Sequence, residues 1–129
     1  MGKDRTTPEV AAASFGIGKL RRHLLMCAGP DCASADDGAE TWDYIKKRMK
    51  ELELTGPNGY VYRTKCTCLR ICTRGPIVVV YPEGAWYRDV TPKNAERILQ
   101  EHVIRGRIVE SLCFAKNPMF LPAHDPDKL

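Results

Sequence analysis

Long apolar runs are missing from this sequence of 129 residues. No stretch approaches the ~20 consecutive apolar residues of a membrane-spanning helix. The N-terminus, MGKDRTTPEVAAASFGIGK, also lacks the apolar core of a secretion signal. We therefore expect a cytoplasmic protein without a membrane partner.

Recognisable catalytic motifs are also missing. The sequence shows no phosphate-binding loop, no nucleophile beside a base and no general-acid arrangement, so we expect no enzymatic activity. No nucleic-acid-binding module is recognisable, and we expect no nucleic-acid partner. The net charge of +4, from 20 basic and 16 acidic residues, does not by itself indicate a partner.

What the sequence has is six cysteines. In a reducing compartment they indicate metal binding or redox chemistry rather than a disulfide framework. A chain of this length, with 43% hydrophobic residues, buries enough surface to fold without disulfides. Three of the cysteines lie in CTCLRIC, Cys66 to Cys72, shortly before the apolar run IVVVY. No two cysteines have the C-x-x-C spacing, which argues against a dithiol oxidoreductase.

The N-terminal half contains an arm, a strand and a helix. Residues 1–19 lack clear periodicity, and we expect a mobile arm there. Arg22 to Cys27 (RHLLMC) is predicted as a buried strand that ends at a cysteine. Ala39 to Leu54 has apolar residues at helical spacing, which predicts an amphipathic helix with Asp36 or Asp37 as its N-cap.

A strand, a hairpin and a second helix follow. Tyr60 to Cys66 (YVYRTKC) is rich in strand-forming residues. Ile77 to Tyr81 and Ala85 to Val90 are predicted as the two strands of a hairpin, joined by the turn residues PEG. The second helix is predicted to begin with Thr91 as N-cap and Pro92 at its first position, and to end before the next glycine.

This order of elements predicts an α/β fold, a thioredoxin-like sandwich with a mixed sheet of four to five strands and two main helices. The domain is expected to span residues 20–114. Within it, Arg107 to Phe114 is predicted as an edge strand or a packed segment. Residues 115–129, with their spaced prolines, are expected to form a loosely ordered tail.

Four cysteines stand at the ends of predicted strands: Cys27 and Cys32 at the first, Cys68 and Cys72 at the second. Because neighbouring parallel strands end at the same edge of a sheet, these thiols are expected to lie close together. The spacings C-x4-C and C-x3-C allow each pair to hold one tetrahedral metal centre. Two such centres bridged by sulfide make a [2Fe–2S] cluster.

Other interpretations of these thiols remain open on spacing alone. Structural zinc also takes four thiolates, although its usual knuckles organise small loops that fold only with the metal. Inert buried cysteines are common, but two polar, glycine-bearing loops are unusual surroundings for them. A Rieske centre needs two histidine ligands, and His23, His102 and His124 are not spaced for that role.

The segments MCAGPDC and CLRICTRGPIVVVYPEGAWYRDVTPKNAERILQEHV resemble the thioredoxin-like [2Fe–2S] ferredoxin family. The resemblance runs from about Arg22 to Val109. It implies that Cys27, Cys32, Cys68 and Cys72 are the ligands of one cluster per chain, the same four that the strand ends select. The family is related to the iron–sulfur subunit of respiratory NADH dehydrogenases and some hydrogenases. A helical segment precedes that subunit's domain, and because the arm here is short we expect the free carrier.

The resemblance also implies a homodimer, to which Trp86 and Tyr87 of the hairpin are candidate contributors. Two cysteines fall outside the ligand set. Cys66 lies two residues before Cys68 and is either a bystander or a spare ligand; we favour the bystander. Cys113 lies between two apolar residues and is expected to be buried.

We therefore expect a small soluble one-electron carrier that exchanges electrons with an unidentified reductase and acceptor. A zinc-stabilised interaction module and an iron–sulfur sensor are the alternatives on the same fold. Basic residues surround the second ligand pair and acidic residues surround the first, and we expect these charges together to orient a redox partner. The basic residues are Arg63, Lys65, Arg70 and Arg74, and the acidic residues are Asp31, Asp36, Asp37 and Glu40.

Overall fold

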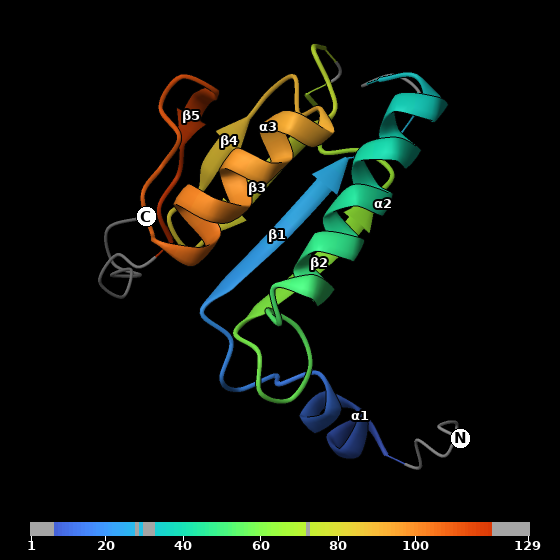
Figure 1. The fold of residues 1–129 in the computed structure, drawn as a ribbon, viewed down its shortest axis with the longest axis vertical. Helices are drawn as coiled ribbons and strands as arrows, with labels where there is room; N and C mark the ends of the chain where they lie inside the picture. The colour runs from blue at the N-terminus through green and yellow to red at the C-terminus, as the bar shows by residue number, and fades with distance from the viewer. Residues whose placement is uncertain (1–6, 28, 30–32, 72, 120–129) are drawn as a thin grey trace, which may run out of the picture.

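A mixed five-stranded sheet organises the protein. The computed structural model describes residues 7–27, 29, 33–71 and 73–119. Its strands follow the order β2-β1-β3-β4-β5, and only the β1–β2 pair is parallel (Figure 1). They are β1 (Arg22–Cys27), β2 (Val61–Cys66), β3 (Ile77–Tyr81), β4 (Ala85–Tyr87) and β5 (Cys113–Lys116). The predicted α/β sandwich with a mixed sheet is confirmed.

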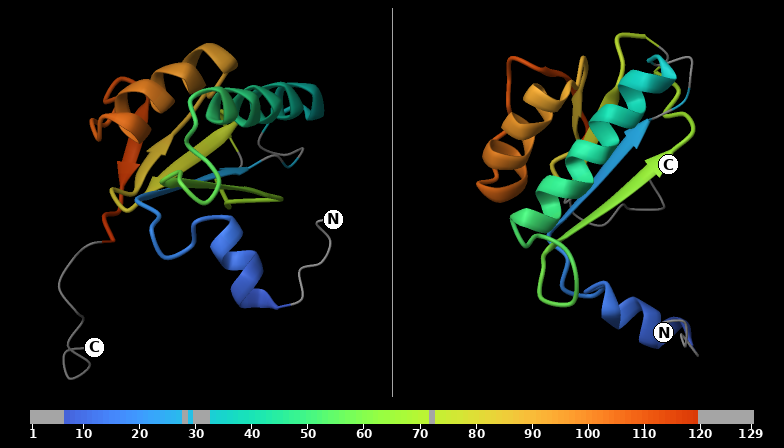
Figure 2. Two further views of the ribbon diagram at one scale, coloured as in Figure 1. Left: turned by 60° about the horizontal axis from the view of Figure 1, so that its bottom comes forward. Right: turned by 45° about the vertical axis from the view of Figure 1, so that its right-hand side comes forward.

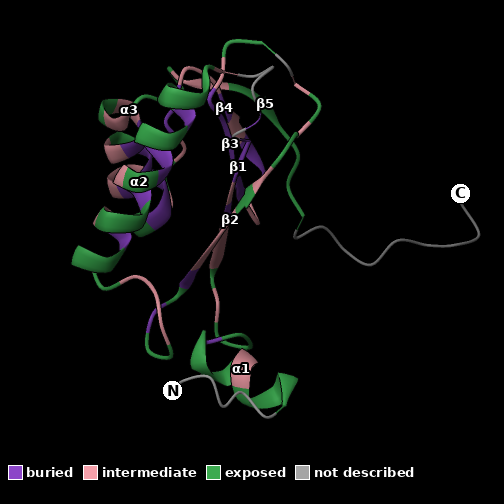
Figure 3. Ribbon diagram, turned by 90° about the vertical axis from the view of Figure 1, so that its right-hand side faces the viewer, coloured by how far each residue is buried: buried purple, intermediate pink, exposed green. Residues whose placement is uncertain are grey.

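Two helices cover one face of this sheet. They are α2 (Ala35–Glu51) and α3 (Pro92–Arg97), and α3 continues as the π-helical segment η1 (Ile98–Ile104). Figure 3 shows both helices on one side of the strands and no helix packed along the other side of the described part. Among the helices of the described ranges, none has the length and apolar character that a membrane crossing requires.

The apolar core lies between the sheet and these helices. Alternate residues of β1 and β3 point into it, because successive strand residues face opposite sides of a sheet. From the helices come Trp42, Ile45 and Met49 of α2, together with Ala95, Ile98, Leu99 and Val103 of α3 and η1. From the central strands come Leu24, Met26, Val78 and Val80, each at most 1% exposed.

Helix α2 begins four residues earlier than the sequence predicted, and its N-cap is not an aspartate. The Ser34 hydroxyl accepts a hydrogen bond from the Asp37 backbone N–H at 3.0 Å, so Asp36 and Asp37 lie in the first turn. A glycine, Gly38, hides this start because glycine is unfavourable inside helices. It is one of the buried residues of this helix. The second helix starts as predicted, since the Thr91 hydroxyl caps the Asn94 N–H.

The segment expected as an arm contains a helix, α1 (Pro8–Ser14). Thr7 caps it by accepting a hydrogen bond from the Val10 N–H at 3.1 Å. The helix buries no residue, which is why apolar periodicity did not reveal it. Just after it, the Phe15 ring contacts Tyr62 of β2 edge to face. The segment therefore packs against the end of the sheet where β1 and β2 begin (Figure 1).

At the other end of the chain, β5 pairs with β4 at the sheet edge. It runs to Lys116, so the sheet takes in the first two residues of the segment expected as a tail. Asn117 continues the contact, since its N–H donates to the Gly84 carbonyl at 2.8 Å. Residues 120–129 lie outside the described residues.

A buried polar network ties the β3–β4 turn to the helices. The Glu83 carboxylate accepts two hydrogen bonds from Arg22, at 3.0 and 2.8 Å, and lies 2.9 Å from His102 Nε2. Burial alone would raise the pKa of Glu83, but the hydrogen bonds from Arg22 and His102 lower it to about 2. Because a carboxylate only accepts, His102 donates through Nε2, and its Nδ1 accepts from the Tyr87 hydroxyl at 2.7 Å. Burial lowers the pKa of His102, in agreement with this neutral form.

Removing the Tyr87 hydroxyl should destabilise the protein. The Tyr87 hydroxyl donates to His102 Nδ1 and accepts from the Val109 N–H at 3.1 Å. Tyr87→Phe would therefore leave His102 Nδ1 without a donor and the Val109 N–H without an acceptor. Unsatisfied buried groups cost about 1–3 kcal/mol, and the loss should appear in the free energy of unfolding by chemical denaturation. Tyr60→Phe is the control, because Tyr60 is 52% exposed and its hydroxyl bonds to no described residue. Equal stability of the two variants would contradict this role for the network.

Candidate metal centre

The parallel pairing of β1 and β2 brings the two cysteine segments to one edge of the sheet. In its register Cys27, the last residue of β1, lies opposite Cys66, the last residue of β2. Cys68 follows two residues later. Cys27 and the Cys66–Cys68 segment, distant in sequence, therefore meet at this edge, whereas the assignment of Cys27, Cys32, Cys68 and Cys72 as ligands stays a prediction.

The two segments touch through their backbones. The Cys27 thiol donates to the Thr67 carbonyl, with 3.6 Å between sulfur and oxygen. A methyl group on Gly29 would lie only 2.1 Å from that same carbonyl oxygen. Gly29 is therefore the residue that permits the approach, because the loops are in contact where any side chain would intrude. No pattern in the sequence indicated the contact between Gly29 and Thr67.

Cys27 lies in apolar surroundings on the helix-free face of the sheet. It is fully buried and packs with Ile77 of β3. The segment after Cys68 folds back over this end of the face, where Leu69, Ile71 and Trp86 pack against the pair. The peptide bond between Gly75 and Pro76, which leads into β3, is cis. A metal ligand at Cys27 would thus be shielded from water on one side, which lowers the local dielectric constant.

In contrast to the buried Cys27, Cys68 is exposed to solvent. Its sulfur accepts a hydrogen bond from the Arg70 backbone N–H, with 3.2 Å between nitrogen and sulfur. Arg70 has a φ of 74°, in the left-handed region, and this turn aims its N–H back at the sulfur. Backbone N–H groups directed at sulfur stabilise negative charge on a thiolate, so the turn suits a metal-bound cysteine.

The other two predicted ligands, Cys32 and Cys72, lie outside the described residues. Among the described residues no group of three or more histidine, cysteine or acidic side chains is placed to hold a metal ion. The described half of the predicted site therefore consists of one buried and one exposed thiol, each contributed by a different segment.

The two remaining cysteines differ from each other. Cys66 lies on the same sheet face as Cys27, and its thiol donates to the Met26 carbonyl with 3.5 Å between sulfur and oxygen. Burial raises the pKa of Cys66, and the neighbouring thiols Cys27 and Cys68 raise it further, which opposes ionisation. Cys113, in β5 on the helix-covered side, is only partly buried, less than the sequence predicted.

The basic residues around the segment from Cys66 to Cys72 differ in their ion pairing. Arg74 is paired with Asp89, with 2.5 Å between Nη2 and Oδ2, and the Asp89 N–H donates to the Arg74 carbonyl at 2.7 Å. Asp89 also lies 3.7 Å from Arg88 Nε, so it offsets part of the charge of both arginines. Arg70 and Lys65 are exposed and have no ion pair within the described ranges. Asp89, which follows β4, thus brings an acidic side chain to the otherwise basic loop around Arg74.

Known proteins similar to this chain place it in a family. It is 33% identical over 106 residues to a protein of Priestia megaterium named as a 2Fe-2S ferredoxin, covering 81% of this chain and 80% of that protein. It is 31% identical over 96 residues to a 2Fe-2S ferredoxin of Clostridium pasteurianum, covering 71% of this chain and 94% of that protein. No protein-family profile matches the chain.

The fold leads to the same family. A solved structure of a thioredoxin-like [2Fe–2S] ferredoxin from Aquifex aeolicus matches with a TM-score of 0.64 at 27% identity, covering 79% of this chain and 98% of that one. The chain belongs to the thioredoxin-like [2Fe–2S] ferredoxin family. The resemblance seen in the sequence and the thioredoxin-like fold class are both confirmed.

The contact between Gly29 and Thr67 leads to a prediction about retention of the expected cluster. Gly29→Ala should push the two cysteine segments apart, because the added methyl would meet a backbone oxygen at 2.1 Å. We expect the visible absorption of this variant to bleach several-fold faster than that of the wild type in excess iron chelator. Gly59→Ala is the matched control, since its methyl would lie 2.3 Å from the Leu54 carbonyl oxygen at the far end of β2. Equal bleaching rates in the two variants would contradict the prediction.

Proposed function

We propose that this protein is a one-electron carrier whose single [2Fe–2S] cluster is held by Cys27, Cys32, Cys68 and Cys72. The observation that carries the proposal is the register that sets Cys27 opposite Cys66, two residues before Cys68. Membership of the thioredoxin-like [2Fe–2S] ferredoxin family supports the choice of iron and sulfide over zinc. When bound, the cluster supplies reversible uptake and release of one electron.

The two proposed ligands that lie within the described residues, Cys27 and Cys68, suit this cluster. Thiolates are the ligands that [2Fe–2S] centres take in ferredoxins. Cys27 offers its sulfur from an apolar environment beside Ile77, and Cys68 offers its own at the surface. The Arg70 N–H, 3.2 Å from the Cys68 sulfur, would favour negative charge there. The apolar surroundings of Cys27 limit access of water to the cluster, and the exposure of Cys68 leaves a route for a redox partner.

Replacing a ligand should deplete the protein of iron. Alanine at any one of the four positions Cys27, Cys32, Cys68 and Cys72 removes a thiolate that no water or hydroxyl replaces well. We expect iron and acid-labile sulfide in the purified variants to fall to less than about half of the wild-type content. Cys27→Ala is the sharpest case, because its sulfur is enclosed.

Cys113→Ala is the matched control, since Cys113 lies three strands away from β1 in the sheet and on the helix-covered side. It should keep full iron and the red-brown colour. Full iron content in Cys27→Ala would refute the ligand assignment. A colourless wild type that binds zinc instead of iron would refute the proposed function itself.

The exchange of electrons implies partner proteins, and we infer a reductase and an acceptor in the cytoplasm. A homodimer is also proposed. Tyr87 cannot contribute to its interface, because the ring is fully buried against η1. Trp86 is only partly buried on the helix-free face, where its ring contacts Phe114 of β5 edge to face. Phe114 also borders a hollow of about 310 Å³ beside Ile71 and Ile77. Thr73, Arg74 and Arg88 complete its lining, so the surface that a second copy would cover combines apolar and basic side chains.

The dimer proposal makes a prediction about mass in solution. Light scattering of the holoprotein at micromolar concentration should give twice the chain mass of 14.5 kDa. Phe114→Glu should shift the mass toward the monomer, because a charge in an apolar interface is costly to desolvate. The control is Ile104→Glu, a residue of similar exposure, 42% against 40%, on the helical side. A monomeric wild type would refute the proposal.

A further inference from the structure

A basic groove lies between α2 and the edge strand β2, which run side by side (Figure 2). Its volume is about 640 Å³. The residues that line it are Asp43, Lys46, Lys47, Lys50, Thr55 and Arg63. Four of the six side chains are cations and only one is an acid, so the lining carries a net positive charge.

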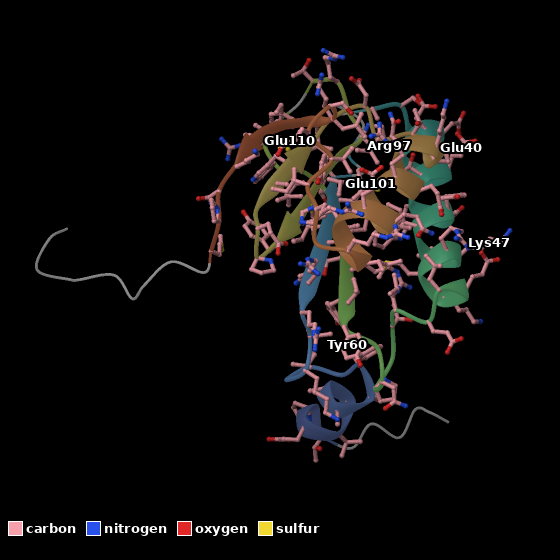
Figure 4. All side chains as sticks on the ribbon, turned by 60° about the vertical axis from the view of Figure 1, so that its left-hand side comes forward. Glu40, Lys47, Tyr60, Arg97, Glu101 and Glu110 are labelled. Carbon is pink, nitrogen blue, oxygen red and sulfur yellow. The ribbon has the colours of Figure 1, made fainter. Side chains whose placement is uncertain are left out.

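The single acid in the groove neutralises little of this charge. Asp43 pairs with Lys46, with 3.4 Å between Oδ1 and Nζ. Lys47 projects from the outer side of α2 (Figure 4). Within the described ranges neither Lys47 nor Lys50 has an ion pair, and Lys65 of β2 has none either. Three positive charges therefore border or adjoin the groove without compensation.

Arg63 is the most unusual member of the groove. Its guanidinium carbon lies 5.8 Å from the centre of the Trp42 ring, a cation–π distance that holds the side chain against α2. Its Nε is buried and has no hydrogen-bond partner, and no described residue accepts from the rest of the guanidinium. An arginine held rigidly with unused donors is suited to a carboxylate ligand.

Helix electrostatics alone do not account for this arrangement. Lysines in the last turns of α2 interact favourably with the helix dipole, which explains Lys47 and Lys50 without any ligand. Arg63 comes from a strand, so the dipole gives no reason for its place among them. The convergence of cations from two elements on one groove is what indicates a binding surface.

The groove borders the first half of β2, and the cysteine edge lies further along the same strand, beyond the acidic first turns of α2. Arg63 lies three residues before Cys66 in β2, a distance of about 10 Å at the rise of a strand. The exposed Lys65 continues the basic surface in that direction. An extended segment bound in the groove would therefore bring its parent protein next to the exposed Cys68.

We propose that this groove binds an acidic segment of a redox partner protein. The proposal rests on the proposed electron-carrier function, and it adds the chemistry of the partner. Glutamate and aspartate side chains of the segment pair with Lys47, Lys50 and Arg63. Such pairs steer association and set orientation, and they weaken as salt screens the charges.

The test is a titration of the oxidised, isotope-labelled holoprotein with a peptide of ten glutamates at low ionic strength, followed by NMR. The Trp42 indole N–H and the amides of β2 should shift and saturate. The triple variant Lys47→Gln, Lys50→Gln and Arg63→Gln should bind about tenfold more weakly, since each exposed pair contributes modestly. The control triple variant Lys93→Gln, Arg105→Gln and Arg107→Gln removes the same charge near the other helix and should stay within about twofold of wild type.

Equal weakening in both triple variants would overturn the proposal, because net charge would then explain the binding. It would also be overturned if the wild type did not bind, or if pyrophosphate shifted the same resonances at lower concentration than the peptide. Iron content and visible spectra of the same samples report separately on the proposed function. A wild type without iron would refute that function, whereas the peptide titration would still test the groove.

Discussion

The parallel pairing of β1 and β2 is the constraint on which the rest of the site depends. Because both strands end at one edge, residues about 40 positions apart in the chain become neighbours. The pairing also sets Gly29 against the Thr67 carbonyl, so that backbone contact, rather than side chains, fixes the separation of the two segments. Antiparallel pairing would place the cysteines of the two segments at opposite ends of the sheet.

The two ends of the sheet are stabilised by different means. At the start of β1, Arg22 joins Glu83, His102 and Tyr87 in a buried polar network that holds the β3–β4 turn against η1. The end of β1 lies about 17 Å away, at the rise of a strand. There the contacts around Cys27 are apolar, from Ile77 and the folded-back segment. The polar network therefore holds the strands together at one end, and at the cysteine end Cys68 is exposed while Cys27 belongs to an apolar cluster.

Much of this could be predicted from the sequence, and the misses have physical reasons. The bounds of β1 and β3 agree with the prediction because their apolar residues are continuous and flanked by turn residues. Helix α1 was missed although Thr7 and Pro8 repeat the start signal of Thr91 and Pro92. It has no apolar face to reveal it. The pair of Arg74 with Asp89 could not be predicted, because it depends on how the hairpin returns to the loop.

Helix α2 separates its charges along its length. Acidic residues occupy its first turns and lysines its last, as the opposed positions of Glu40 and Lys47 show in Figure 4. The backbone dipole of a helix amounts to about half a charge at each end, positive at the N-terminus, and here the side chains outweigh and reverse it. The helix thus carries a net electric moment with its negative pole toward the cysteine edge. The field of an approaching anion exerts a torque on this moment, which favours orientations that turn the C-terminal half of α2, where the basic groove lies, toward the anion before any contact is made.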